Sequence, residues 1–389
     1  MTQQEPSLLC QKKCYLRKNS NMRKVLVLSL SLLLAVAIIS CSSKSGVSRI
    51  EGAITINVPI YYNDSVQFPS TSRLFDSVSV VLETGAFETL LGERIKDVKI
   101  LDDTLIILSG DFVNNNLQLF DINGRFIRKI DRSGRGPQEY INIKKIDIDP
   151  VKRHIIIFDS GSGMLRYTMK GNFVSKARYE YDASDFALLP DGGYVLFNPF
   201  AKTPHGGLWT IDSQGNFKRT LISYDDNTFN VIVGDRWLTH INDSVIGFSG
   251  TKDNIYHFAD DTVYTAYHII SEIIDPDEEP DENRIPPYGK ERYFESDNLM
   301  MFNLTKMQQP YHYVRTFYEK KRGQADFFFW STHPTIPQDN QVPHFVCNYK
   351  DYFFRELTSL SIQNNDELKA RYPDITEESN PVLQIFRSK

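Results

Sequence analysis

Cysteine is scarce in this sequence: only four of the 389 residues are cysteines. Two of them, Cys10 and Cys14, precede an apolar N-terminal segment that we expect to be removed, and we expect Cys41 to carry lipid. Only Cys347 then remains, and a single thiol excludes a disulfide framework and a cysteine-based metal cluster. We expect Cys347 to be a small buried hydrophobic residue.

Basic residues are also fewer than acidic residues. The chain carries 44 Lys and Arg against 49 Asp and Glu, a net charge of −5. Residues 1–40 hold six Lys and Arg and one Glu, so the net charge is −10 without them. Nucleic-acid binding requires a basic face that neutralises phosphates, and the composition therefore argues against it.

Metal-binding motifs and long helices are missing as well. The eight histidines form no His-Glu-x-x-His motif and no pair at i and i+4 spacing. Residues 75–320 contain no long amphipathic helical pattern, whereas aromatic residues make up 12% of the chain. Aromatic side chains pack well on pleated sheets, so the composition favours β-structure.

The N-terminal region carries a pattern typical of export. Residues 22–24 (MRK) are basic, and residues 25–39 form an uncharged apolar run. This run is shorter than the roughly 20 residues of a membrane span and suits the core of a signal peptide. Residues 38–41 (IISC) resemble a bacterial lipobox. We predict a signal peptide over residues 22–40 and lipid on Cys41, with an uncleaved membrane anchor as the alternative.

These assignments give an expected organisation and location. Residues 1–21 have no targeting pattern and are interpreted as an over-long gene start. Residues 41–74 are expected to be a tether and lead-in, and residues 75–389 a single domain. We expect the protein to lie in the cell envelope, lipid-anchored to the outer membrane and facing the periplasm or the cell surface.

Two signals recur in the middle of the chain at intervals of about 45 residues. Glycine-containing hairpin turns place Gly124, Gly171 and Gly215 at spacings of 47 and 44 residues. Short apolar strands also recur, and each follows an acidic turn that begins at Asp102, Asp149, Asp191, Asp243 or Asp297. Four short strands in each unit are typical of a β-propeller blade.

A single blade exposes both of its faces, and stacking blades around a ring buries them. We therefore predict an all-β fold, a six-bladed β-propeller of four-stranded antiparallel blades. A spare strand within residues 77–93 is expected to close the ring by completing the last blade, and residues 357–378 to form a loop or helix before the final strand. The predicted blades cover residues 95–131, 140–178, 181–223, 235–270, 292–320 and 343–388.

The connection between the first two predicted blades, IDRSGRGPQEYINI (residues 130–143), holds the candidate ligand contacts. It begins like the dinucleotide fingerprint G-x-G-x-x-G, but Glu139 replaces the last glycine and no helix follows. We therefore interpret it as an inter-blade turn. Because propeller ligands bind at loops around the channel mouth, the candidate ligand contacts are Arg132, Arg135, Glu139 and Tyr140.

No motif identifies a metal or a cofactor. Residues 275–282 contain six acids, but an EF-hand loop needs glycine where Pro280 stands, so we interpret them as a solvated insert. Calcium held by residues from separate strands is an open alternative without a supporting motif. Aromatic clusters at residues 327–330 and 349–354 fit either a blade core or stacking on sugars.

The sequence resembles the six-bladed β-propeller lipoproteins of Gram-negative gut anaerobes, which are loosely similar to NHL-repeat propellers. The segments that carry this resemblance are VVLET (80–84), LFDINGRFIRKI followed by GRGPQEY (134–140), IIIFDSGSGMLRY (155–167) and ITEESNPVLQIF (375–386). The biochemical role of that family is largely undefined, so the resemblance implies fold and cellular address.

The leading functional hypothesis is a monomeric, lipid-anchored, non-catalytic module. Rigid blades would position variable loops that bind a protein, a peptide or a glycan. The alternative is a metal-dependent enzyme, similar to a lactonase or a lyase, with its site in the central channel. A purely structural envelope component is a third hypothesis.

Overall fold

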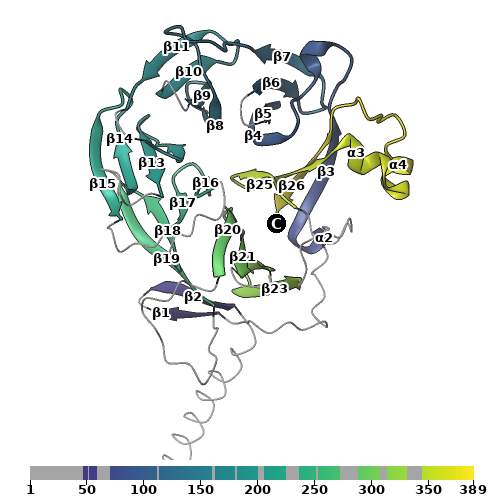
Figure 1. Ribbon diagram of the computed structural model, residues 1–389. Helices are drawn as coiled ribbons and strands as arrows, with labels where there is room; N and C mark the ends of the chain where they lie inside the picture. The colour runs from purple at the N-terminus through teal and green to yellow at the C-terminus, as the bar shows by residue number, and fades with distance from the viewer. Residues whose placement is uncertain are drawn as a thin grey trace, which may run out of the picture.

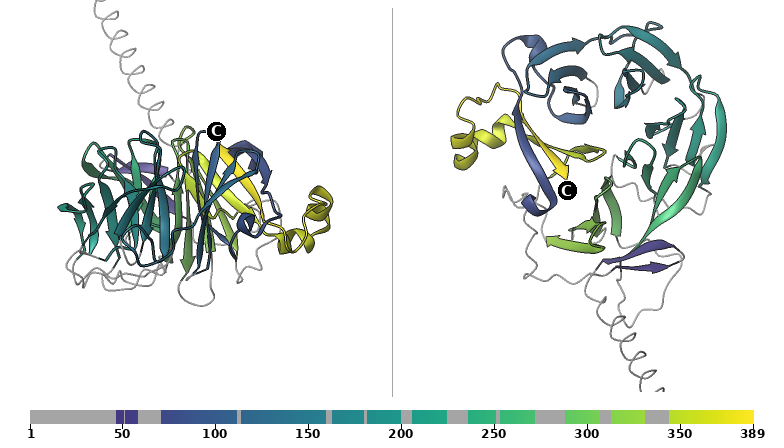
Figure 2. Two further views of the ribbon diagram at one scale, coloured as in Figure 1. Left: turned by 90° about the horizontal axis from the view of Figure 1, so that it is seen from above. Right: turned by 180° about the vertical axis from the view of Figure 1, so that it is seen from behind.

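The computed structural model describes residues 47–50, 52–58, 71–111, 114–159, 163–179, 182–199, 206–224, 236–250, 253–271, 288–306, 313–330 and 344–389. In this part of the chain six small sheets stand around a central axis (Figure 1). A side view shows the strands running between the two faces of the ring (Figure 2). The predicted six-bladed β-propeller is confirmed.

The first three blades are each built from four consecutive antiparallel strands. Blade one contains β4 (Ile95–Leu101), β5 (Thr104–Gly110), β6 (Asn115–Asp121) and β7 (Phe126–Ile130). Blade two contains β8 (Ile143–Asp149), β9 (His154–Asp159), β10 (Gly163–Thr168) and β11 (Phe173–Ala177). Blade three contains β12 (Asp185–Leu188), β13 (Tyr194–Asn198), β14 (Gly207–Ile211) and β15 (Phe217–Ser223).

The last three blades follow the same order. Blade four contains β16 (Leu238–His240), β17 (Ile246–Ser249), β18 (Asn254–Ala259) and β19 (Thr262–Ser271). Blade five contains β20 (Tyr288–Glu295), β21 (Leu299–Lys306), β22 (Tyr313–Glu319) and β23 (Gln324–Trp330). Blade six contains β24 (Cys347–Tyr349), β25 (Tyr352–Leu357) and β26 (Val382–Ser388).

The predicted range of blade five, 292–320, was too short, because the blade extends to β23. This strand ends in three phenylalanines and a tryptophan. Such a run lacks the alternation of polar and apolar residues that marks a half-buried strand.

The ring is closed by a strand from the N-terminal part of the chain. β3 (Phe75–Val81) pairs antiparallel with β26, from Phe75 opposite Ser388 to Val81 opposite Val382. The fourth strand of blade six therefore precedes blade one in the sequence. This confirms the prediction that a spare N-terminal strand closes the ring. The innermost strands β4, β8, β12, β16, β20 and β24 each contact the next around the axis.

Hairpin turns at the ends of the strands follow the predicted pattern. Gly124, Gly171 and Gly215 have φ values of 88°, 81° and 96°, a region of backbone conformation that glycine enters without steric cost. Asp102 has a φ of 51°, which an aspartate tolerates better than most residues.

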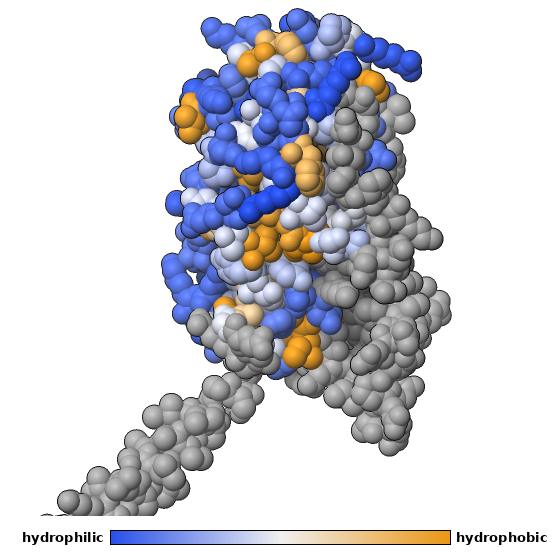
Figure 3. All heavy atoms as spheres, turned by 90° about the vertical axis from the view of Figure 1, so that its left-hand side faces the viewer, coloured by the Kyte–Doolittle hydropathy of each residue, from blue (hydrophilic) through white to orange (hydrophobic). Residues whose placement is uncertain are grey.

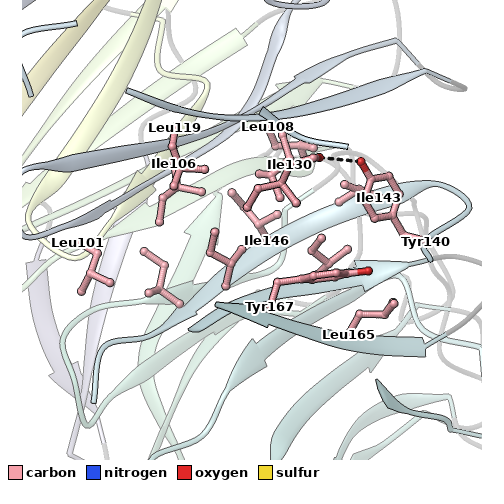
Figure 4. Packing of buried hydrophobic residues seen from close by; sticks show 14 residues of the cluster. Leu101, Ile106, Leu108, Leu119, Ile130, Tyr140, Ile143, Ile146, Leu165 and Tyr167 are labelled. Carbon is pink, nitrogen blue, oxygen red and sulfur yellow. Dashed lines mark hydrogen bonds between the residues drawn. The ribbon is translucent and has the colours of Figure 1, made fainter. Parts of the chain in front are cut away.

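The hydrophobic core lies between neighbouring blades. Between blades one and two, Ile106 and Leu119 share one buried cluster with Ile146 and Leu165 (Figure 4). Each blade thus buries both faces of its sheet. This is why the inner and middle strands read as nearly continuous apolar runs.

Four short helical segments complete the described part of the fold. α2 (Thr71–Leu74) and the 3₁₀ turn η1 (Phe87–Thr89) flank β3. α3 (Ser359–Gln363) and α4 (Asp366–Arg371) lie between β25 and β26, where the sequence predicted a loop or helix. The side chains of Thr358 and Asn365 cap α3 and α4 by accepting hydrogen bonds from backbone N–H groups.

A hairpin from the predicted lead-in extends blade four. β1 (Val47–Ile50) pairs with β2 (Ala53–Val58), and β2 pairs in parallel with the rim strand β19 (Figure 1). Ile56 and Val58 are 0% and 2% exposed, and such burial contributes about 1.5–3 kcal/mol for each side chain. No strand was predicted for this segment.

The predictions for Cys347 and for the N-terminal region have different outcomes. Cys347 is a buried free cysteine, as predicted. The expected gene start, signal peptide and lipidated Cys41 lie outside the described residues. Among the helices that are described, none is long and apolar enough to span a membrane.

Candidate functional site in the axial channel

A polar pocket lies on the ring axis, and all six blades line it. The innermost strands contribute Lys99 from blade one, Lys145 and Asp147 from blade two, Ala187 from blade three, His240 from blade four, Tyr293 from blade five and Asn348 from blade six. Arg236 also lines it, just before β16. The space between these side chains is about 350 Å³, part of it open to solvent.

Three aspartates of the innermost strands link successive blades. Asp97, Asp147 and Asp185 each accept a hydrogen bond from the N–H of the following residue. The other carboxylate oxygen accepts from a backbone N–H of the next blade, at Ile146 (3.4 Å), Leu188 (2.8 Å) or Leu238 (2.9 Å). Each innermost strand is an edge strand of its own sheet, so some of its backbone N–H groups have no acceptor within that sheet. The aspartate carboxylates accept hydrogen bonds from these groups.

Each of these aspartates also has a basic partner. Lys99 Nζ lies 2.9 Å from Asp97 Oδ1, and Arg236 Nη1 lies 3.4 Å from the same oxygen. Lys145 Nζ lies 2.6 Å from Asp185 Oδ1. His240 Nε2 lies 2.7 Å from Oδ2 of Asp147. Carboxylates and basic side chains of blades one to four therefore pair along the channel.

The pairing keeps the carboxylates ionised in spite of burial. Burial by itself would raise the pKa of Asp97, but Lys99 and Arg236 outweigh it and hold that pKa below its ordinary value. Burial would also raise the pKa of Asp147, but His240 outweighs it and holds the pKa of this carboxyl well below its usual range. Both carboxyls are therefore ionised at neutral pH.

Blades four, five and six are joined across the channel by Asn348. Its Oδ1 accepts a hydrogen bond from Thr239 Oγ1 at 2.7 Å, and its Nδ2 donates to the Glu295 carbonyl at 2.8 Å. In blade six, Cys347 Sγ accepts from the N–H of Val98 in blade one at 3.2 Å. The thiol thus takes the place that an aspartate occupies in blades one, two and three.

The arrangement limits the chemistry available to the channel. Its charged side chains are paired with one another. Within the described ranges, no group of three or more His, Cys, Asp and Glu residues could hold a metal ion.

The predicted contacts around GRGPQEY fall into two classes. Arg132 and Arg135 are exposed on the connection between β7 and β8. Glu139 shapes this connection, because its carboxylate accepts from the Gly136 N–H at 2.7 Å. A Cβ at Gly134 would lie 2.0 Å from Oε2 of Glu139, so a larger residue there would displace this carboxylate.

Tyr140 belongs to the core. It is 3% exposed, and its hydroxyl donates to the Ile130 carbonyl at 3.0 Å (Figure 4). Burial raises the pKa of Tyr140 to about 12. The structure therefore exposes Arg132 and Arg135, leaves Glu139 half-buried and buries Tyr140, and the last two hold the segment that carries the arginines.

The axial residues were missed in the sequence. The available signal was the alternation of Lys and Asp in "KDVK" (96–99) and "KKIDID" (144–149), which is unusual for strands that are otherwise apolar. Of the aromatic clusters, Phe328, Phe353 and Phe354 are core residues. The acidic insert at residues 275–282 lies outside the described part of the chain.

A second buried polar centre lies between blades four and five. The Glu295 carboxylate is fully buried and accepts hydrogen bonds from the hydroxyls of Tyr267, at 2.9 Å, and Tyr293. His257 Nε2 lies 3.0 Å from Oε2, and Lys320 Nζ lies 2.7 Å from Oε1. Burial would raise the pKa of Glu295, but Lys320 and His257 outweigh it and lower that pKa to about 2.

This centre predicts an acid-dependent loss of stability. A carboxyl whose pKa falls from 4.5 to about 2 on folding stabilises the protein above pH 4.5, and that stabilisation disappears as the pH falls toward 2. The contribution is on the order of 3 kcal/mol. Urea unfolding at pH 7, 5, 4 and 3 should show the advantage of wild type over Glu295→Gln shrinking below pH 4.5. Glu88→Gln, at an exposed position, serves as the control, and a pH-independent difference for Glu295→Gln would contradict this assignment.

The two faces of the ring differ in their connections. On one face, which we call the tight-turn face, the connections within the blades contain two to five residues. The opposite face, the long-connection face, carries the inter-blade connections and the remaining intra-blade loops, with three to twenty-four residues each. Antiparallel strands make this assignment unambiguous, because successive connections alternate between faces. Arg132 and Arg135 lie on the long-connection face.

Comparison with known proteins supports the fold and leaves the activity undefined. Residues 53–387 match the family model described as Domain of unknown function (DUF4934). No curated protein matches the chain. A Bacteroides fragilis protein described as exported shares 18% identity at a TM-score of 0.66, covering 86% of this chain and 99% of that one. A DUF4221 member from Bacteroides vulgatus shares 9% identity at a TM-score of 0.48, covering 84% and 99%.

Proposed function

The chain belongs to the DUF4934 family, and because that family has no defined activity, we propose a function from the geometry: a lipid-anchored envelope propeller that binds a protein or glycan partner without catalysis. The observation that carries this proposal is the contrast between the two faces of the ring. Every long connection lies on one face, and the axial channel beneath it is filled by paired charges. Rigid blades that present variable loops on one side are suited to recognition.

The described part of the channel gives less support to the enzyme alternative. A catalytic acid, base or nucleophile needs a free site beside a space that admits substrate. The channel residues are instead engaged with one another, and the space is small. Stoichiometric calcium or zinc in the purified chain would favour the metal-dependent enzyme over the binding module.

Export and lipid attachment rest on the N-terminal sequence. The Bacteroides fragilis protein of similar fold, described as exported, is consistent with this compartment. We expect Cys41→Ala to move the protein from the membrane fraction to the soluble fraction. Fractionation of cells that carry each form measures this shift, and continued extraction of Cys41→Ala only by detergent would contradict lipid attachment.

Recognition through the long-connection face can be tested with matched charge reversals. Arg132→Glu combined with Arg135→Glu alters this face, whereas Lys152→Glu combined with Lys170→Glu alters exposed turns of the opposite face. Binding is measured against an array of envelope glycans and against a cross-linked envelope fraction. We expect the first pair to weaken binding at least about tenfold and the second to leave it unchanged. Equal effects of the two pairs would remove the assignment of the binding face.

A further inference from the structure

The N-terminal hairpin fixes the point at which a lipid tether joins the ring. β2 pairs in parallel with β19, the rim strand of blade four, from Ile54 opposite Tyr267 to Val58 opposite Ser271. Ile56 and Val58 lie in the cluster of buried residues shared by blades four and five. Because these side chains are part of the core, β2 is a permanent member of the rim of blade four.

The sequence leaves a short spacer between this hairpin and the predicted lipidation site. Cys41 precedes the first residue of β1, Val47, by only six positions. Six residue steps extend at most about 20 Å, and a spacer rich in serine and glycine averages less. A lipid on Cys41 would therefore hold the rim of blade four close to the headgroups.

We propose that the ring stands on the membrane with the rim of blade four toward the lipid surface and blade one farthest from it. This inference rests on the lipid attachment proposed above. The partner of this rim is the headgroup region of the bilayer.

The surface of this side of the ring fits contact with headgroups and not insertion. Figure 3 shows the side that includes β15, and its described atoms are mainly hydrophilic with small, separate apolar patches. Exposed apolar side chains on β19 include Tyr264, at 47%, and Ile270, at 39%. Isolated residues of this kind are ordinary on soluble surfaces and form no membrane-embedding patch.

Electrostatic attraction to the membrane does not set the orientation of the ring. Without residues 1–40 the chain carries a net charge of −10, so an anionic lipid surface gives no general attraction. The length and position of the spacer are therefore the features that set which rim faces the bilayer. Lengthening the spacer should release the ring from this orientation.

The test uses the lipidated full chain in vesicles of phosphatidylethanolamine and phosphatidylglycerol that contain a headgroup-attached quencher. Single fluorophores are placed on Tyr264→Cys in β19 of blade four or on Ile127→Cys in β7 of blade one, which are 47% and 43% exposed. Cys347 is fully buried, and the parent chain serves as the check that it takes no label. We expect several-fold stronger quenching at position 264 than at position 127.

A second variant separates the orientation from the anchor. Insertion of about 20 glycine and serine residues after Ser45 should abolish the difference between the two probe positions. Equal quenching in the original chain, stronger quenching at 127, or a difference that survives the insertion would each overturn the orientation. Vesicle flotation is measured on the same samples. A chain that fails to float overturns lipid attachment and the orientation together, whereas a floating chain with equal quenching overturns the orientation alone.

Discussion

A chain that starts at Leu82, and therefore lacks β3, is expected not to form a closed ring. β3 supplies the fourth strand of blade six and pairs with β26 along its whole length. Phe75 contacts the rings of Phe345, Phe353 and Phe386 at centroid distances of 5.4, 5.3 and 5.7 Å. Removal of β3 exposes this cluster and leaves β26 as an unpaired edge.

The expected loss approaches the stability of an entire domain. Burial of Phe75 and Val80 contributes about 1.5–3 kcal/mol for each side chain, and the ladder to β26 disappears with them. Whole domains are stable by only about 5–15 kcal/mol. Near-ultraviolet circular dichroism and limited proteolysis should show loss of fixed tertiary packing at 25 °C.

A chain that starts at Thr71 is the matched control for this truncation. It lacks β1 and β2 but keeps β3 and the closure of the ring. It should retain cooperative unfolding at a lower Tm, because it loses the buried side chains of Ile56 and Val58. If both truncations unfold alike, closure by β3 is not the decisive interaction.

Asp185→Ala is expected to destabilise the ring by about 3–5 kcal/mol, the range for breaking a buried ion pair by removing one partner. The Asp185 carboxylate accepts hydrogen bonds from the N–H groups of Trp237 and Leu238, both at 2.9 Å. It also pairs with Lys145 at 2.6 Å. Alanine leaves a buried ammonium without its carboxylate and two edge N–H groups without their acceptor.

Two further variants define what this measurement reports. Asp185→Asn keeps an acceptor for the backbone but removes the charge opposite Lys145, so we expect an intermediate loss. Asp243→Ala removes a surface ion pair in which the aspartate is 74% exposed, and we expect a loss of about 0–1 kcal/mol. Chemical denaturation of the four proteins at pH 7 measures these differences. Equal losses for Asp185→Ala and Asp243→Ala would show that the axial pair does not join the blades.

The blade pattern could be predicted because its signals are local. A hairpin turn needs its glycine a few residues from the strands it joins, and the acidic turns recur with the period of one blade. The same locality explains where the prediction was incomplete. β23 ends in consecutive aromatic residues, and β2 pairs with a strand more than 200 positions away, so neither leaves a short-range signal.

The predicted ligand contacts show what the sequence could not decide. Glu139 and Tyr140 were predicted as ligand contacts because they lie in an unusual sequence. That sequence is unusual because it forms a particular turn. The carboxylate of Glu139 fills the space beside Gly134, and the ring of Tyr140 packs between two blades. A sequence marks such residues as unusual without stating whether they face solvent or core.

The sequence by itself determined the number of blades, the strand that closes the ring and the expected route of export, because each depends on residues near one another or on a fixed repeat. Only the tertiary structure decided how Asp97, Asp147 and Asp185 join neighbouring blades and which face carries the long connections. Those properties arise when strands about 40–50 residues apart meet at one axis, and no single stretch of the chain contains that geometry.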